Sequence, residues 1–257
     1  MRRLLPAYAV AAYAFLYLPL LVLSAFSFNA SRFTVWHGFT FHWYAEAFRN
    51  QQMLDAIFNS LVIGVTASVV ATAAGTLAAY GIWKRRASWL TNSLYLSLLT
   101  PEIVTGISLL AFFQWIFRFL HVQLGLHTVI LAHVSFSLAY AVVVVLARLR
   151  NFDAILEEAA LDLGANEWQA FRRVTLPFLA PAIVAAALLC FAVSFDDYVI
   201  TSLVAGVNSE TLPMVIYALA RRGISPAVNA LSAMVTFGLG ALILIAERLQ
   251  ARSKAGK

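Results

Sequence analysis

Residues 128–147 read TVILAHVSFSLAYAVVVVLA and contain no Asp, Glu, Lys or Arg. As a helix, a stretch of this length crosses the roughly 30 Å hydrocarbon core of a bilayer. The rest of the chain has a similar character, because 62% of its 257 residues have apolar side chains and only 12% are charged. A soluble domain carries about 25% charged residues. The sequence therefore predicts an integral membrane protein, and its net charge of +6 is not interpreted as a nucleic-acid-binding surface.

Five further apolar stretches of spanning length predict an all-α, polytopic membrane protein with six transmembrane helices. The six spans are expected at Leu4–Phe28, Asn59–Trp83, Leu94–Leu120, Thr128–Ala147, Pro181–Val204 and Asn229–Ala246. The first stretch is too long for the apolar core of a signal peptide, so we interpret it as a retained span. We expect one transmembrane domain over residues 1–257, in which the first span, 4–28, precedes a core of five spans over 59–246.

The orientation follows from the distribution of basic residues, since Lys and Arg favour cytoplasmic loops. Placing the N-terminus in the cytoplasm puts all but five of the 18 Lys and Arg residues on the cytoplasmic side. The five on the other side are Arg32, Arg49, Arg118, Arg221 and Arg222. Both termini are therefore predicted to be cytoplasmic. The first external segment, 29–58, is rich in aromatic residues and is predicted to lie at the membrane interface.

The polar segment 148–176 is predicted to be a cytoplasmic helix–Gly–helix element between the fourth and fifth spans. Asp153 suits the N-cap of a helix starting at Ala154, and Gly164 suits the left-handed residue that ends it. Asn166, with Gln169 three residues later, predicts a second capped helix. The first helix has an apolar arc formed by Ile155, Leu156, Ala159, Ala160 and Leu163. Because its other face is acidic and the cytoplasmic leaflet is negative, a protein partner suits this helix better than a lipid surface.

Three carboxylates lie within predicted spans: Glu102, and the neighbours Asp196 and Asp197 on one expected helix. An acid at a helix centre costs about 2.5–3.5 kcal/mol, so each should face the bundle interior, a cavity or a partner charge. One interpretation is a cation site, in which a substrate with ammonium groups relieves the repulsion between adjacent acids. The other is an internal salt bridge or a helix-end contact. Aromatic rings attract cations, and the nearest candidates are Trp115, Tyr198 and Tyr217.

The loop pattern Glu158-Ala159-Ala160-x-x-x-Gly164, followed after nine residues by Val174-x-Leu176-Pro177, resembles the EAA loop of ABC importer permeases. Val174 replaces the Ile that is usual in the family. The resemblance implies a type I ABC importer permease fold, with this loop as a coupling helix that docks into a separate ATP-hydrolysing subunit. The ATPase-coupling residues implied are Glu158, Ala159, Ala160, Gly164, Leu176 and Pro177.

Other motifs look like the spermidine/putrescine branch of these permeases, and in particular its second permease subunit. They include Thr100-Pro101-Glu102-Ile103-Val104, Ser194-Phe195-Asp196-Asp197-Tyr198-Val199 and Leu212-Pro213-x-x-Ile216-Tyr217. The resemblance implies polyamine import across a bacterial inner membrane, with substrate-binding roles for Asp197, Asp196, Glu102, Tyr198, Trp115 and Tyr217. The implied partners are a second, similar permease, two copies of an ATPase and an external substrate-binding protein. Related branches carry opines, phosphonates or iron, so another small solute is the alternative.

The chain itself is not expected to be an enzyme or to hold a cofactor. It lacks the Gly-x-x-x-x-Gly-Lys-Ser/Thr pattern that cradles phosphates, so ATP is expected to bind to a partner. The spans provide neither the converging metal ligands nor the nucleophile–base spacing that an intramembrane enzyme needs. A secondary transporter would explain the buried acids but not the acidic, capped loop. Cys190 is predicted to be a small buried apolar residue, and His133 to have a structural role.

Overall fold

The computed structural model describes residues 4–31, 35–120, 122–221 and 226–255, and these residues are helical almost throughout. This agrees with the predicted all-α class. The chain forms two compact units, one of residues 1–57 and 212–257 and the other of residues 58–211. Arg32 and Arg222, which enter the predicted orientation, lie outside the described residues.

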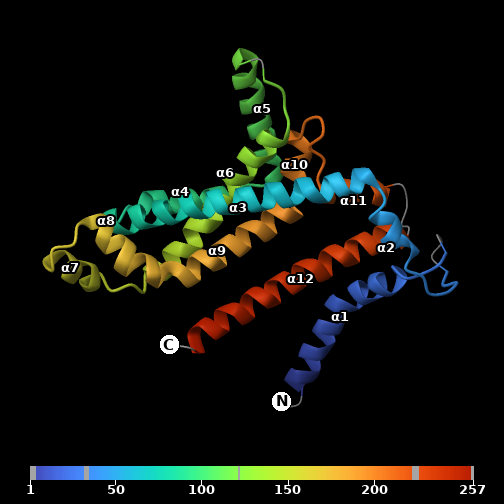
Figure 1. Cartoon of the computed structure of the whole chain (residues 1–257), viewed down its shortest axis with the longest axis horizontal. Coiled ribbons are helices and arrows are strands. Elements are labelled where there is room, and N and C mark those ends of the chain that lie inside the picture. Colours follow the sequence, from blue (N-terminus) through green and yellow to red (C-terminus); the bar gives the residue numbers. More distant parts are fainter. Residues whose placement is uncertain (1–3, 32–34, 121, 222–225, 256–257) are drawn as a thin grey trace. The chain divides into compact units, whose positions relative to one another are not determined.

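The first unit contains α1 (Leu4–Phe26), α2 (His42–Ala47), α11 (Leu212–Arg221) and α12 (Pro226–Ala255), and α12 contacts each of the other three (Figure 1). Between α1 and α2 the predicted aromatic segment folds around the buried side chain of Asn29. The amide oxygen of Asn29 accepts from the backbone N–H of His37 at 2.9 Å, and the indole of Trp43 donates to the Asn29 carbonyl at 2.8 Å. The rings of Phe28 and Phe39 stack beside them, with centroids 4.9 Å apart.

The second unit is a bundle centred on α6 and α9, which pack along each other (Figure 1). It includes α3 (Gln51–Arg85) from Phe58 onward. The elements that follow in chain order are α4 (Ser88–Leu99), α5 (Glu102–Leu120), α6 (Leu126–Leu149), α7 (Ile155–Asp162), α8 (Glu167–Ala170), the π-helical turn η1 (Phe171–Thr175), α9 (Leu176–Asp196) and α10 (Val199–Val204).

Small residues let the helix backbones of this core approach closely. A Cβ on Gly75 of α3 would lie 2.6 Å from the Cβ of Ala141 on α6, so this crossing requires glycine. Leu149 and Leu179 are completely buried in the same core. Cys190 is also completely buried, with its thiol 3.4 Å from the Ser137 carbonyl, which confirms its predicted packing role.

Five helices among the described residues are long and apolar enough to cross a membrane. They are Tyr8–Phe26, Gln51–Arg85, Glu102–Leu120, Leu126–Leu149 and Glu167–Asp196. The structure thus supports a polytopic membrane protein and contains the predicted span 128–147 inside α6.

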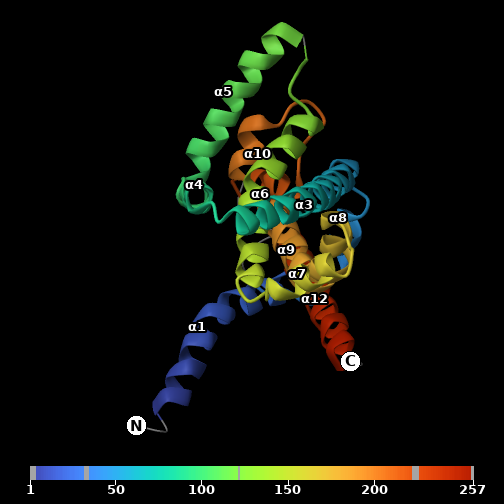
Figure 2. The same cartoon turned by 90° about the vertical axis from the view of Figure 1, so that its left-hand side faces the viewer.

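The third predicted span, Leu94–Leu120, was wrong in being continuous. Pro101 disfavours helical backbone at the preceding residue, and Thr100 is extended (φ −68°, ψ 129°), so α4 ends and α5 begins at Glu102. The 19 residues of α5 are long enough to span alone. Its residues as far as Phe113 pack against α10 and α6, whereas its C-terminal end projects beyond these helices (Figure 2).

The fifth predicted span, Pro181–Val204, was wrong at both ends. A continuous helical segment runs from Glu167 to Asp196, so Pro181 lies within it rather than at its start. The π-helical turn precedes Pro177, and there the N–H of Leu176 donates to the carbonyl of Phe171, five residues earlier. At the other end the chain becomes extended at Asp197 (φ −68°, ψ 126°), so Asp196 and Asp197 do not share one helix.

Candidate functional site

The two helix breaks of the second unit face a common cavity of about 640 Å³. This volume is in the range of small-molecule sites. The lining residues come from the α4–α5 break, from α6 and from the α9–α10 break. They are Ser97, Leu98, Thr100, Glu102, Thr105, Ser135, Phe136, Tyr140, Ala192, Val193, Asp196, Asp197, Tyr198, Val199 and Ile200.

The lining is acidic. It includes Glu102, Asp196 and Asp197, and no Lys or Arg is among the described residues that line it. Glu102 stands in the first turn of α5, where the helix dipole favours a negative charge. Glu102 and Asp196 are exposed, and neither carboxylate has a hydrogen bond to another described residue. These two carboxylates are therefore available to a ligand.

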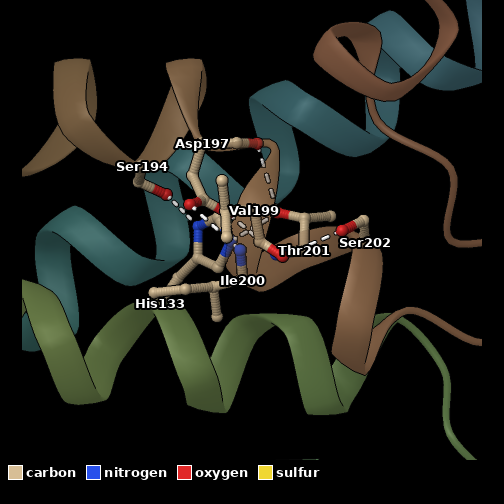
Figure 3. A network of polar contacts seen from close by, with 7 residues as sticks. All are labelled: His133, Ser194, Asp197, Val199, Ile200, Thr201 and Ser202. Atoms are coloured by element: carbon tan, nitrogen blue, oxygen red, sulfur yellow. Dashed lines mark hydrogen bonds and ion pairs between the residues drawn. The ribbon is translucent and has the colours of Figure 1, made fainter. Parts of the chain in front are cut away.

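Asp197, in contrast, is engaged by the chain itself (Figure 3). Its side chain is only 5% exposed and caps α10. The carboxylate accepts from the backbone N–H groups of Ile200 at 3.3 Å and Thr201 at 2.8 Å, and from the Thr201 hydroxyl at 2.7 Å. The structure therefore gives Asp197 the helix-end contact that was the alternative to direct cation binding.

The imidazole of His133, on α6, ties together the two sides of the α9–α10 break (Figure 3). Nδ1 is 2.6 Å from the Ser194 hydroxyl on α9, and Nε2 is 2.9 Å from the Thr201 hydroxyl on α10. Because Thr201 gives its single hydroxyl proton to Asp197, it can only accept from Nε2–H. Nδ1 then accepts from Ser194, so one directed chain runs from Ser194 through His133 and Thr201 to Asp197.

The predicted aromatic residues divide into two groups. Tyr198 lines the cavity, together with Phe136 and Tyr140, which sequence reasoning did not select. Trp115 does not line it; this residue of α5 is 64% exposed, and its ring lies edge-on to Phe119. Tyr217 belongs to the first unit, where its hydroxyl accepts from Arg221 at 3.1 Å.

The loop between α6 and α9 has the predicted helix–Gly–helix form. The Asp153 carboxylate accepts from the N–H of Ile155 at 3.0 Å, and α7 begins there, one residue later than expected. Gly164 has φ +88°, which confirms the predicted left-handed turn. Asn166 and Gln169 form the predicted reciprocal cap, with distances of 2.8 and 3.0 Å.

The apolar arc of α7 faces away from the rest of its unit. Leu156 is 53% exposed and Leu163 89%, and both belong to the predicted arc. Glu158, Ala159 and Gly164 are also exposed, whereas Ala160 is partly buried. Leu176 and Pro177 begin α9. An exposed apolar helix face beside an acidic residue is the pattern expected of a surface that a protein partner covers.

A family model described as "Binding-protein-dependent transport system inner membrane component" matches residues 71–255. The match covers most of the chain and includes the cavity and the loop. The chain belongs to this family. It is accordingly a multi-pass inner-membrane permease, the component of an ABC transport system that does not itself bind or hydrolyse ATP. This confirms the predicted transport class and its dependence on an ATPase and an external binding protein.

Two curated relatives resemble the permease over nearly its full length. It is 39% identical to the "Spermidine/putrescine transport system permease protein PotC" of Escherichia coli (strain K12), over 96% of this chain and 93% of the relative. It is 38% identical to the "Putrescine transport system permease protein PotI" of the same organism, over 94% of this chain and 89% of the relative.

A solved structure supports the fold of the permease. A chain of a bacterial ABC transporter involved in the import of the acidic polysaccharide alginate superimposes with a TM-score of 0.77, at 17% identity, over 98% of this chain and 94% of that chain. At this identity the likeness concerns the fold alone. It agrees with the predicted ABC importer permease fold.

Sequence reasoning assigned His133 a structural role but did not find its network. The signal available was one imidazole in the run 128–147, which contains no Asp, Glu, Lys or Arg. Its partners Ser194 and Thr201 lie 61 and 68 residues away, so only the folded chain reveals that they meet.

Proposed function

We propose that this permease imports polyamines of the spermidine/putrescine type. The observation that carries the proposal is the acid-lined cavity, in which the carboxylates of Glu102 and Asp196 have no partner among the described residues. The naming of PotC and PotI for spermidine and putrescine supports the same substrate class.

The chemistry of a polyamine suits this cavity. Its ammonium groups are separated by methylene segments, so two separated carboxylates can each accept a charge-assisted hydrogen bond. The rings of Phe136, Tyr140 and Tyr198 can add apolar contact with the methylene segments and cation–π attraction for the ammonium groups. In this proposal Glu102 and Asp196 contact the substrate, and Asp197 holds the backbone that presents Asp196 and Tyr198.

We further propose a single permease domain of six spans with both termini in the cytoplasm. The sixth span would be α12, which is 30 residues long and contains the expected segment 229–246. The family model extends over residues of both units, which supports one domain. The permease would pair with a second, similar permease to enclose the path, and two ATPase copies would bind on the cytoplasmic side.

The coupling surface proposed is the exposed face of α7 with the turn that follows it. Glu158, Ala159 and Gly164 would contact a cleft of the ATPase, while Ala160 and the start of α9 at Leu176-Pro177 support this surface. Closure of the ATPases on ATP would push the loop, and the cavity would open to each side of the membrane in turn.

Reconstitution of the intact transport complex in proteoliposomes tests the substrate class. With the binding protein outside and ATP inside, labelled putrescine or spermidine should accumulate, and unlabelled polyamine should compete. Methylphosphonate should not compete, because the carboxylates that line the cavity repel an anion. Uptake that is insensitive to excess polyamine, or that requires an ion gradient instead of ATP, would contradict the proposal.

Replacement of Glu158 tests the coupling surface. Glu158→Lys reverses an exposed charge on the proposed contact, so uptake should be abolished while the variant still assembles with the second permease. Co-purification of the two permeases, measured beside uptake, checks both parts. Normal uptake by this variant would refute the proposed role of the loop.

A further inference from the structure

A second face of the coupling loop contacts the membrane helix α3. Tyr80 and Lys84 stand one turn apart near the C-terminal end of α3. The Tyr80 hydroxyl donates to the carboxylate of Glu157 on α7. The Lys84 ammonium lies 3.8 Å from the carboxylates of both Glu157 and Glu167, and it donates to the Tyr80 hydroxyl at 3.3 Å.

Glu157 differs from the other acids of the loop because it is buried. Its side chain is 6% exposed, whereas that of Glu167 is 81% exposed. A buried carboxylate that loses its partners keeps the full cost of its desolvation, and for this reason α7 and α3 resist separation at this point. The exposed pair between Lys84 and Glu167 is expected to add little.

Aromatic packing reinforces the same contact. The ring of Tyr80 lies 4.7 Å from that of Phe171 in the π-helical turn and 6.0 Å from that of Trp83 on α3. Phe171 is itself buried and stacks on Trp168 of the loop at 5.6 Å. Polar and apolar contacts therefore join the end of α3 to both helices of the loop.

We propose that Tyr80, Lys84 and Glu157 form a clamp through which movement of the coupling loop displaces α3 as well as α9. α9 moves with the loop because it continues from the loop without a break. The proposal rests on the coupling role proposed above, and it assigns Tyr80, Lys84 and Glu157 as positioning residues that transmit motion and do not touch the ATPase.

The clamp would deliver the motion to both sides of the cavity. α9 carries Asp196 at its end, and α3 packs at Gly75 against Ala141 of α6, the helix that carries His133. A displacement of the loop would thus move the α9–α10 break and its α6 support together, instead of pulling α9 alone.

The first test is the amount of polyamine imported per ATP hydrolysed by the reconstituted complex. Tyr80→Phe removes only the hydroxyl, and Glu157→Gln removes only the charge, so both variants should fold. Each should retain ATP hydrolysis while uptake per ATP falls about fivefold or more, the usual scale of coupling between sites. The double variant should lose no more than the stronger single variant, because both changes break the same contact. Wild-type stoichiometry in both single variants would overturn the proposal.

Glu167→Gln is the matched control, because it makes the same substitution at an exposed acid whose pair with Lys84 is expected to add little. It should keep the wild-type ratio of uptake to hydrolysis. A normal ratio in Glu157→Gln combined with abolished uptake in Glu158→Lys would reject only the clamp. Normal uptake in both would reject the coupling role of the loop itself.

A distance measurement separates a clamp from a purely structural contact. Spin labels on Arg85→Cys and Asp162→Cys, in a Cys190→Ala background, report the separation between the end of α3 and α7. With the clamp intact, one narrow distance should persist in the nucleotide-free and the ATP-bound complex. In Glu157→Gln the distribution should broaden on ATP binding. A shift of the distance between the two states with the clamp intact would contradict joint movement.

Discussion

Asp196 and Asp197 differ in how far the chain satisfies their carboxylates. Asp196 is exposed to the cavity and has no hydrogen bond to a described residue, whereas Asp197 accepts three from Ile200 and Thr201. Burial of a carboxylate is tolerated when its acceptor sites are filled, and the cap on α10 fills those of Asp197. The charge that remains available to a cation at this helix break is that of Asp196.

Separate replacement of the two acids should give different defects. Asp196→Asn removes a substrate-facing charge worth about 1.5–3 kcal/mol in a charge-assisted contact, so the polyamine concentration for half-maximal uptake should rise about tenfold or more. Its thermal unfolding should be unchanged. Asp197→Asn places an amide N–H₂ among donors, so the purified protein should unfold at a lower temperature. Unfolding midpoints and uptake curves for both variants check this. If Asp197→Asn unfolded at the wild-type temperature and only its substrate binding were weakened, Asp197 would be assigned as a substrate contact.

The sequence singles out Glu102, Asp196 and Asp197 as acids within predicted spans, but it does not distinguish their roles. An acid in an apolar stretch is visible by composition, and its cost in a membrane predicts a cavity or a partner. Asp197 has a partner within the chain, instead of facing the cavity freely, because of Thr201, His133 and a break in the helix at Asp197. Nothing in the local pattern locates that break, because no Pro or Gly lies between Pro181 and Gly206.

The α7–α8 element shows the opposite case, in which local signals suffice. Capping and the left-handed glycine act over three or four residues, so Asn166, Gln169 and Gly164 were predictable from spacing. The orientation of the element was not, because it depends on the distant residues Tyr80 and Lys84. The broken third span lies between these cases, since Pro101 is a local signal for an irregular helix, whereas the separation into α4 and α5 is seen only in the folded chain.

Gly164 provides a test of this element. A Cβ at Gly164 would meet no atom of this chain within 4 Å, so within the permease Gly164→Ala introduces no clash and acts through the strained φ of +88°. That strain costs about 1–2 kcal/mol and should loosen the turn between α7 and α8. ATP-driven uptake should fall several-fold, and Gly164→Asn should recover part of it because Asn tolerates this conformation better. Equal, wild-type uptake by both variants would show that the turn geometry is not needed for coupling.

At the scale of the whole molecule, the number of spans determines where the C-terminus lies. Four spans precede the loop 148–176 and two would follow it, so six spans place the loop and both termini on one side of the membrane. If α12 did not cross, the C-terminus would lie on the external side. The distribution of Lys and Arg favours the first arrangement.

Site-directed labelling of membrane vesicles tests this topology. In a Cys190→Ala background, Asp162→Cys on α7 and Ala45→Cys on α2 are exposed single cysteines. A membrane-impermeant maleimide should label Asp162→Cys only in inside-out vesicles and Ala45→Cys only in right-side-out vesicles. A protease-sensitive tag added after residue 257 should be cleaved only in inside-out vesicles, as six spans require. Cleavage from the outside would mean that α12 does not span the membrane. Labelling of Asp162→Cys from the outside would separate the loop from any cytoplasmic ATPase, because the apolar face of α7 would then lie on the wrong side of the membrane.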